Sequence, residues 1–300
     1  MTAPLTPMTD LRFRIVAALL VAATLAILPA LRFGAGAAAM VLATAGAIGV
    51  AIAVWPIVRR RRVLRTPLPE SQRAILLAEV DLYRRLGAAE RKRFEDDVAI
   101  FLAEQTITGP RGEPIDEELR VLVAASAAIV AFGRPGFRYP TTRDVIVYEG
   151  TFDEHYGTRA SERGGKSYLG MVHGSGPILF SARALRDGFR NAHDANNVGL
   201  HEFAHVLDYH AGHADGVPGF MPWGSVRPWL AMMHDETTRI RQHRSILREY
   251  AATNEAEFFA VATEMFFEQP DRMKEKHPDL YALMTQAYGQ DPAMRSTMTP

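Results

Sequence analysis

The stretch Gly199–Asp208 reads Gly-Leu-His-Glu-Phe-Ala-His-Val-Leu-Asp and contains the pattern His-Glu-x-x-His. Because His201 and His205 are four residues apart, they lie on one face of an α-helix, where their imidazoles can bind the same tetrahedral metal ion. Glu202 lies beside them and can reach a metal-activated water as a general base. Asp208 follows one turn after His205 and can accept the outer ring N–H of a ligand histidine. The stretch therefore predicts a metal-binding helix.

The composition limits the remaining ligands. The chain has 300 residues with 34 basic and 34 acidic side chains, so no charge bias favours direct binding to nucleic acid. It contains no cysteine, which excludes a disulfide scaffold, a thiol nucleophile and a cysteine zinc site. A zinc ion in this protein must be bound by His, Asp or Glu side chains.

Two apolar runs near the N-terminus predict a transmembrane hairpin. Residues 15–31 and about 35–58 contain no charged side chain and are long enough to cross a bilayer. The first run alone also fits a cleaved signal peptide, but the second would still anchor the chain. Arginines flank the pair, and only Arg32 lies between the runs, so the positive-inside rule places both ends in the cytoplasm. We therefore expect a multi-pass protein of the inner (cytoplasmic) membrane, with a membrane segment at 1–65 and a cytoplasmic domain at 66–300.

Residues 66–300 have the composition of a soluble domain, and their apolar spacing predicts an α+β fold that is mostly helical with a small sheet. The predicted helices are 72–86, 88–105, 117–131, 196–210, 228–242, 255–267 and 278–288, and the predicted strands are 144–148, 168–173 and 176–181. Pro177 at the start of the last strand suits the edge of a sheet. The glycines of the loop 213–223 make this loop a candidate lid.

A third metal ligand must come from outside the His-Glu-x-x-His helix. The helix predicted after Tyr250 is apolar but carries Glu257 and Glu264, which are seven residues apart and project to the same side. A carboxylate among apolar neighbours is costly unless it is paired or bound to a metal. Glu255 lies in the first turn, where it can interact with the helix dipole. The pattern alone leaves Glu257 and Glu264 as rival ligands.

The segments His201–Asp208, Tyr250–Val261 and Gly176–Leu179 together resemble the Mlc titration factor A family, a family of zinc-dependent peptidases of the gluzincin type. The resemblance covers roughly residues 75–295 and implies a zincin-like metallopeptidase fold with one zinc ion. It implies that Glu257 is the third ligand and that Glu264 supports a ligand or the structure. It also implies that Tyr250 donates a hydrogen bond to the oxyanion. Known members of the family are soluble, so the membrane hairpin is a departure.

These observations predict a membrane-tethered zinc peptidase. A zinc-activated water, with Glu202 as general base, would hydrolyse a bond of a peptide or protein substrate. The strand that begins with Gly176, Pro177 and Ile178 is the candidate for pairing with an extended substrate. The alternative is a regulatory protein that sequesters a transcription regulator, as the family name implies, with weak or incidental peptidase activity. In both cases the hairpin would contact the lipid bilayer.

Overall fold

The computed structural model describes residues 35–139, 144–152, 168–172, 176–209 and 214–296. The chain divides into two compact units, residues 1–66 and 67–300, and each is described by itself.

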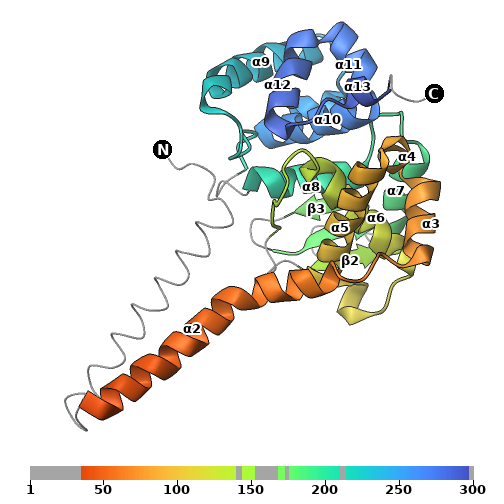
Figure 1. Cartoon of the computed structure of the whole chain (residues 1–300). Helices are drawn as coiled ribbons and strands as arrows, with labels where there is room; N and C mark the ends of the chain where they lie inside the picture. Colours follow the sequence, from red (N-terminus) through yellow and green to blue (C-terminus); the bar gives the residue numbers. More distant parts are fainter. Residues whose placement is uncertain (1–34, 140–143, 153–167, 173–175, 210–213, 297–300) are drawn as a thin grey trace. The chain divides into compact units, whose positions relative to one another are not determined.

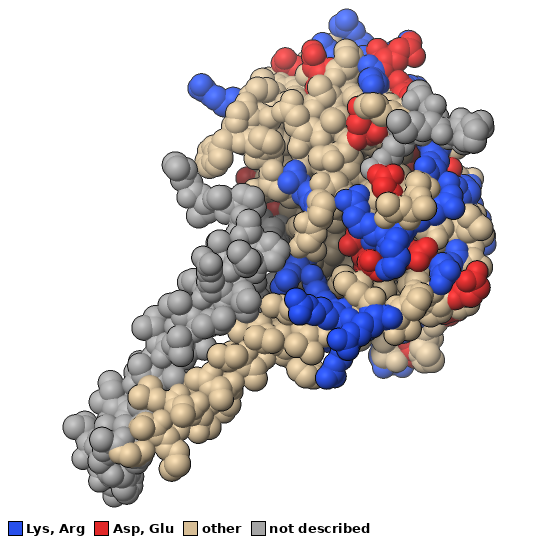
Figure 2. All heavy atoms as spheres, in the orientation of Figure 1, with Lys and Arg blue, Asp and Glu red and all other residues tan. Residues whose placement is uncertain are grey.

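The first unit contains the long helix α2 (Ala35–Val63). Among the described residues, α2 is the one helix that is long and apolar enough to cross a membrane; the candidate span is Ala39–Val63, within which an 18-residue window has a mean hydropathy of 2.2. Its last turn is basic, with Arg60, Arg61 and Arg62, and Figure 2 shows no charged side chain along the rest of its visible face. The first predicted membrane helix, 15–31, lies outside the described residues.

Within the described residues, the second unit contains a four-stranded mixed sheet with the order β1-β2-β4-β3. Its strands are β1 (Ile107–Thr108), β2 (Val145–Tyr148), β3 (Gly170–Val172) and β4 (Ile178–Ser181). β2 is parallel to both β1 and β4, with Val145 opposite Ile178, whereas β3 is antiparallel to β4, with Met171 opposite Leu179. The expected α+β fold, mostly helical with a small sheet, is confirmed.

The prediction that residues 176–181 form an edge strand is wrong. β4 lies inside the sheet, between β2 and β3, and all four of its residues are buried. Pro177 precedes the first paired residue, so its missing N–H removes no bond from the sheet. The N–H of Ile178 donates to Asp144 O at 2.9 Å. Within the described residues, the edge on this side of the sheet is β3.

The helices of the second unit include all the predicted ones, with several differences in extent. They are α3 (Glu70–Glu79), α4 (Asp81–Arg85), α5 (Ala88–Glu104), α6 (Glu117–Ala131), α7 (Ala182–Arg190), α8 (Val198–Tyr209), α9 (Trp223–Arg241), α10 (Glu255–Glu268), α11 (Pro270–Lys276), α12 (Pro278–Tyr288) and α13 (Pro292–Ser296), with short 3-10 turns η1 (Pro110–Gly112) and η3 (Glu249–Ala252). The predicted helix 72–86 divides at Val80 into α3 and α4, and α9 begins at Trp223 instead of Pro228. The helices α7, α11 and α13 were not predicted.

α8 lies at the centre of the second unit, between two groups of elements (Figure 1). It packs against α10 on one side and against α6, α7 and β3 on the other. A Cβ on Gly199 would overlap the Oγ of Ser126 on α6, so glycine is needed where these two helices cross. Phe203 lies on the same side of α8 as Gly199, and its ring packs against the rings of Phe101 and Phe180. This packing fixes which face of α8 is turned toward α10.

Candidate metal centre

α8 begins with a side-chain cap. Asn197 precedes the first helical residue, and its Oδ1 accepts the N–H of Leu200 at 3.2 Å. The amide nitrogen of Asn197 donates to Gly188 O and to Glu268 Oε1, so this residue ties the start of α8 to α7 and α10. The cap and the buried packing face together fix the rotation of α8, and so the direction of its histidines.

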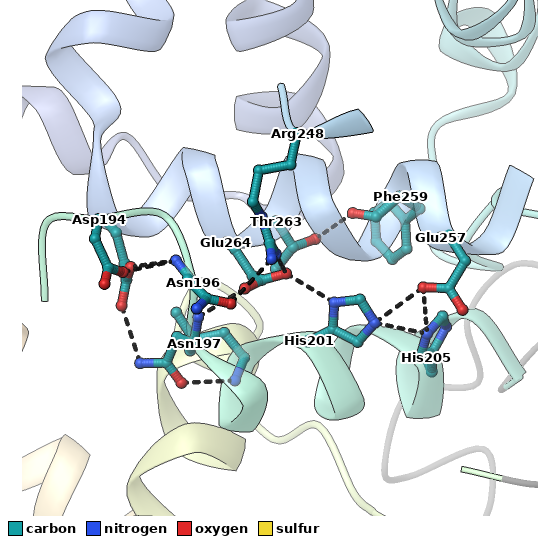
Figure 3. A network of polar contacts seen from close by, with 12 residues as sticks. Asp194, Asn196, Asn197, His201, His205, Arg248, Glu257, Phe259, Thr263 and Glu264 are labelled. Atoms are coloured by element: carbon teal, nitrogen blue, oxygen red, sulfur yellow. Dashed lines mark hydrogen bonds and ion pairs between the residues drawn. The ribbon is translucent and has the colours of Figure 1, made fainter. Parts of the chain in front are cut away.

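His201, His205 and Glu257 bring three ligand atoms together (Figure 3). His201 Nε2 lies 3.2 Å from His205 Nε2. Glu257 Oε2 lies 3.0 Å from His201 Nε2 and 3.5 Å from His205 Nε2. Two donors on a tetrahedral zinc ion, each about 2.0–2.1 Å from the metal, are separated by about 3.3 Å. The three separations match this value, so the residues fit one zinc-sized cation.

The burial and charge of Glu257 also fit a shared cation. Glu257 Oε2 is buried and has no hydrogen bond of acceptable geometry within the described residues, although it lies close to both imidazoles. Burial alone would raise the pKa of Glu257, but His201 and His205 outweigh this effect and lower the pKa, so the carboxylate is ionised. The centre therefore presents an anionic oxygen and two imidazole nitrogens to one point.

Glu264 supports His201 from the opposite side of the ring. Its Oε1 lies 2.7 Å from His201 Nδ1, and its side chain is only 1% exposed. A hydrogen bond from Nδ1–H to this carboxylate leaves the Nε2 lone pair facing Glu257 and His205. The structure therefore gives the two rival acids of α10 different positions: Glu257 lies among the ligand atoms, and Glu264 orients a ligand.

Glu202 lies next to the metal centre, where it is buried and has unused hydrogen-bonding capacity. It is 4% exposed, and its Oε2 has no hydrogen-bond partner among the described residues. Burial raises the pKa of Glu202, although the two histidines act to lower it. A raised pKa brings a carboxylate closer to the range that suits proton transfer near neutral pH. A Cβ on Gly170 of β3 would overlap Glu202 Oε1, so this glycine makes room for the carboxylate.

Tyr250 lies beside the centre on the 3-10 turn η3. Its ring centroid is 6.0 Å from that of His201, and the residue is 49% exposed. Tyr250 is therefore too exposed to be a packed core residue. Burial of part of the side chain and the nearby charge of Glu257 raise the pKa of Tyr250 to about 12. The hydroxyl therefore stays protonated at neutral pH and can donate a hydrogen bond.

The structure gives Asp208 a different partner from the predicted one. Its Oδ2 accepts the N–H of Gly216 at 2.8 Å, and no hydrogen bond to a ligand histidine is present among the described contacts. Gly216 also accepts a hydrogen bond from Trp229 Nε1 at 2.7 Å. It has a φ of +71°, and a Cβ there would overlap the backbone of Glu255. The described part of the loop 213–223 is therefore tied to the core at this glycine, and its glycines do not by themselves indicate a lid.

Three further residues shape the centre but were not predicted. Asn197 could have been recognised, because an asparagine directly before an apolar helix is a typical cap. Gly170 and Arg248, whose guanidinium contacts Glu264, carry no local signal, because their roles depend on contacts between distant segments. Of the predicted substrate residues, Gly176 and Pro177 precede the internal strand β4, and Ile178 is its first residue.

A cavity of about 500 Å³ lies at the start of α8. Its wall includes Leu169, the residue before β3, and Ala184 and Asp187 on α7. Val198, which also lines it, is one helical turn before Glu202, and both residues lie against Gly170. The cavity therefore lies near Glu202, although neither Glu202 nor the three ligand residues line it.

Comparisons with known proteins agree with the metal centre. The chain is 30% identical over 256 residues to Mlc titration factor A of Edwardsiella ictaluri, covering 76% of this chain and 89% of the relative. It is 29% identical over 237 residues to Mlc titration factor A of Salmonella arizonae, covering 72% and 90%. An uncharacterized protein of Synechocystis is 26% identical over 252 residues, covering 79% and 90%. Residues 55–289 match the model of the glucose-regulated metallo-peptidase M90 family, and the chain belongs to this family.

Proposed function

We propose that this protein is a membrane-tethered zinc peptidase, with one zinc ion held by His201, His205 and Glu257. The observation that carries this proposal is the convergence of three ligand atoms at 3.0–3.5 Å from one another. Zinc bound in such a site supplies Lewis acidity toward a carbonyl oxygen and lowers the pKa of water to about 7. Membership of a metallopeptidase family supports peptide hydrolysis as the reaction.

The chain's own residues would move the protons. Glu202 is buried beside the ligands and would accept a proton from the attacking water, then deliver it to the leaving amine. Tyr250 stays protonated and faces the site from η3, so it would donate a hydrogen bond to the developing oxyanion. One such donor is typically worth about 3 kcal/mol of transition-state stabilisation. Glu264 would hold His201 in the tautomer that leaves Nε2 free for the metal.

An extended peptide would bind along β3. The strand that begins near Gly176, which the sequence pattern indicated for this role, lies inside the sheet as β4. β3 pairs with β4 on one side, contacts α8, and lies at the end of the sheet that the described residues form. An edge strand can add one more strand through main-chain hydrogen bonds. Since Leu169 precedes β3 and lines the cavity beside it, a peptide paired with β3 would extend into that cavity. The substrate would then be a peptide or an unstructured protein segment.

We further propose that residues 1–65 anchor the protein in the inner membrane and that residues 66–300 form its cytoplasmic domain. The apolar length of α2 and the arginines in its last turn support one crossing with this turn in the cytoplasm. A second crossing at 15–31 rests on the apolar sequence alone. A protease-protection assay on sealed membrane vesicles tests the topology, because the domain must be digested only from the cytoplasmic side.

A second candidate is a regulatory protein that binds and sequesters a transcription regulator. The relatives named Mlc titration factor A favour this alternative. Hydrolysis would then be weak, and the metal centre would serve the structure of the binding surface. The two functions differ in their dependence on Glu202, because binding needs no proton acceptor.

The decisive experiment compares the wild-type protein with the Glu202→Gln variant. The purified full-length protein should contain one zinc per chain and cleave members of a peptide library, whereas E202Q should retain zinc and lose cleavage. Retention of full cleavage by E202Q would refute the role of Glu202. A protein that binds no stoichiometric zinc would refute the metal centre. Zinc binding without cleavage in the wild type would instead support the second candidate.

A further inference from the structure

We propose that Arg248 is a positioning residue that couples the orientation of the ligand His201 to the placement of Tyr250. This inference rests on the proposed function, because it assigns a role within the same metal centre. Arg248 touches none of the three ligand residues in the described contacts. It acts through Glu264 on one side and through the chain leading to Tyr250 on the other.

The first half of the coupling is a polar network at the start of α8 (Figure 3). Arg248 Nη2 contacts Glu264 Oε1 at 2.5 Å, and Nη1 donates to Asn196 Oδ1 at 2.9 Å. The same Glu264 Oε1 faces His201 Nδ1, while Oε2 accepts the backbone N–H of Asn197 at 2.6 Å. The guanidinium therefore binds both the acid that orients His201 and the residue just before the helix cap.

The contact between Arg248 and Glu264 matters because the Glu264 carboxylate is buried. Glu264 has a side-chain exposure of 1%, so its ionised form requires compensating donors. Among the described residues, Arg248 is the one arginine or lysine that contacts Glu264, whose other charged or imidazole partner is His201. Without Arg248, the Glu264 carboxylate would keep two hydrogen-bond donors, His201 Nδ1 and the N–H of Asn197, but would lose the positively charged guanidinium beside it. Glu264 would then hold His201 less firmly, or would move toward solvent with the opening left by the arginine.

The second half of the coupling runs through the backbone. Arg248 directly precedes η3, and its carbonyl accepts the N–H of Ala251 at 3.0 Å, which closes the turn that carries Tyr250. The guanidinium contacts hold the start of this turn against α8 and α10. The Tyr250 ring, half exposed and only 6.0 Å from His201, depends on this anchor for its position. One side chain thus sets both the metal ligand and the proposed oxyanion donor.

A lysine cannot replace this arginine fully. The planar guanidinium places two N–H groups on two different acceptors, whereas an ammonium group is a single point charge. Arg248→Lys should therefore preserve the charge beside Glu264 but lose the simultaneous contact with Asn196. This variant therefore distinguishes a requirement for positive charge beside Glu264 from a requirement for simultaneous hydrogen bonds to Glu264 and Asn196.

The test uses the full-length protein and the variants Arg248→Ala, Arg248→Lys and Arg186→Ala. Arg186 is the matched control, because its guanidinium also contacts two acids, Asp116 and Glu118, but lies outside the described network of the metal centre. Zinc affinity is measured by competition with a chromogenic chelator. The values of kcat and KM are measured on a cleaved peptide at saturating zinc, and thermal unfolding reports on stability.

We expect Arg248→Ala to weaken zinc binding about 10–100-fold, the usual loss when a group that orients a ligand is removed. At saturating zinc, kcat should fall about tenfold or more with KM changed less than threefold, because a misplaced oxyanion donor affects the transition state. Millimolar guanidinium should restore part of kcat in this variant. Arg248→Lys should fall between the wild type and Arg248→Ala, and Arg186→Ala should lose stability without changing zinc affinity.

Zinc affinity and kcat of Arg248→Ala within twofold of the wild type would overturn the inference. Equal losses in Arg186→Ala would also overturn it, because they would reflect stability alone. A wild type that binds zinc but cleaves nothing contradicts the proposed peptidase, whereas the zinc affinities still decide whether Arg248 orients His201. A wild type without zinc affinity refutes the proposed metal centre and this inference together.

Discussion

The substitution Gly170→Ala tests whether the free space beside Glu202 is required for catalysis. A Cβ at this position would lie 2.6 Å from Val198 Cγ2 and would overlap Glu202 Oε1. Ordinary carbon contacts are about 3.5–4.0 Å, so both Val198 and Glu202 must give way, each by about 1 Å. Val198 belongs to the first turn of α8, which is held by the Asn197 cap, whereas Glu202 Oε2 has no partner among the described residues. We therefore expect the Glu202 side chain to move.

A displacement of about 1 Å in a catalytic group can cost about 100-fold in rate. Gly170→Ala should thus lower kcat about 100-fold while leaving zinc content at one per chain, as measured by metal analysis of the same sample used for kinetics. Gly224→Ala is the control, because no atom lies within 4 Å of the added Cβ. If Gly170→Ala keeps kcat within threefold and unfolds like the wild type, the carboxylate does not need this space and the argument fails.

Three further predictions concern the ligands, a buried acid and the cavity. Glu257→Ala should abolish tight zinc binding, whereas Glu264→Gln should weaken it only about 10–100-fold in a chelator competition; the reverse order would exchange their roles. Burial raises the pKa of Glu268 from 4.5 to about 8, so between these values the folded chain holds a proton that the unfolded chain has lost. The stability of the wild type relative to Glu268→Gln should therefore fall by on the order of 4 kcal/mol as pH rises from 5 to 8, measured by urea unfolding, and a constant difference would contradict this pKa. Ala184→Phe should raise KM about tenfold for long peptides but not for short ones if the cavity holds substrate, and equal effects on both would exclude it.

Local patterns were sufficient for the elements whose signals are contained within one segment. The helix predicted at 117–131 has the same bounds in α6, where Asp116 caps the first turn by accepting the N–H of Leu119 at 2.8 Å. The pattern of His201, Glu202 and His205 likewise lies within one helix, and its spacing alone places the two imidazoles together.

Features that depend on distant segments could not be predicted in this way. The apolar content of 176–181 indicates a strand but not its neighbours, so Pro177 was interpreted as a mark of an edge. The position of β4 depends on pairing with β2 and β3, which come from other parts of the chain. The two-residue strand β1 is too short to show an alternating pattern, so it has no distinct sequence signal. By contrast, α7 begins directly after β4 but does carry a local signal, because Ser181 caps its first turn by accepting the N–H of Ala184.

The choice between Glu257 and Glu264 shows how tertiary packing completes a site that a helical pattern leaves open. Seven residues correspond to about 10 Å along a helix axis, so two acids on one face cannot both reach the same point on a crossing helix. Where α10 crosses α8, Glu257 reaches the Nε2 atoms of both histidines, and Glu264 reaches Nδ1 of His201 from the other side. One helix therefore supplies both a ligand and the group that orients another ligand. Adding one residue between the acids would rotate them apart by about 100°, so α10 could keep either contact but not both.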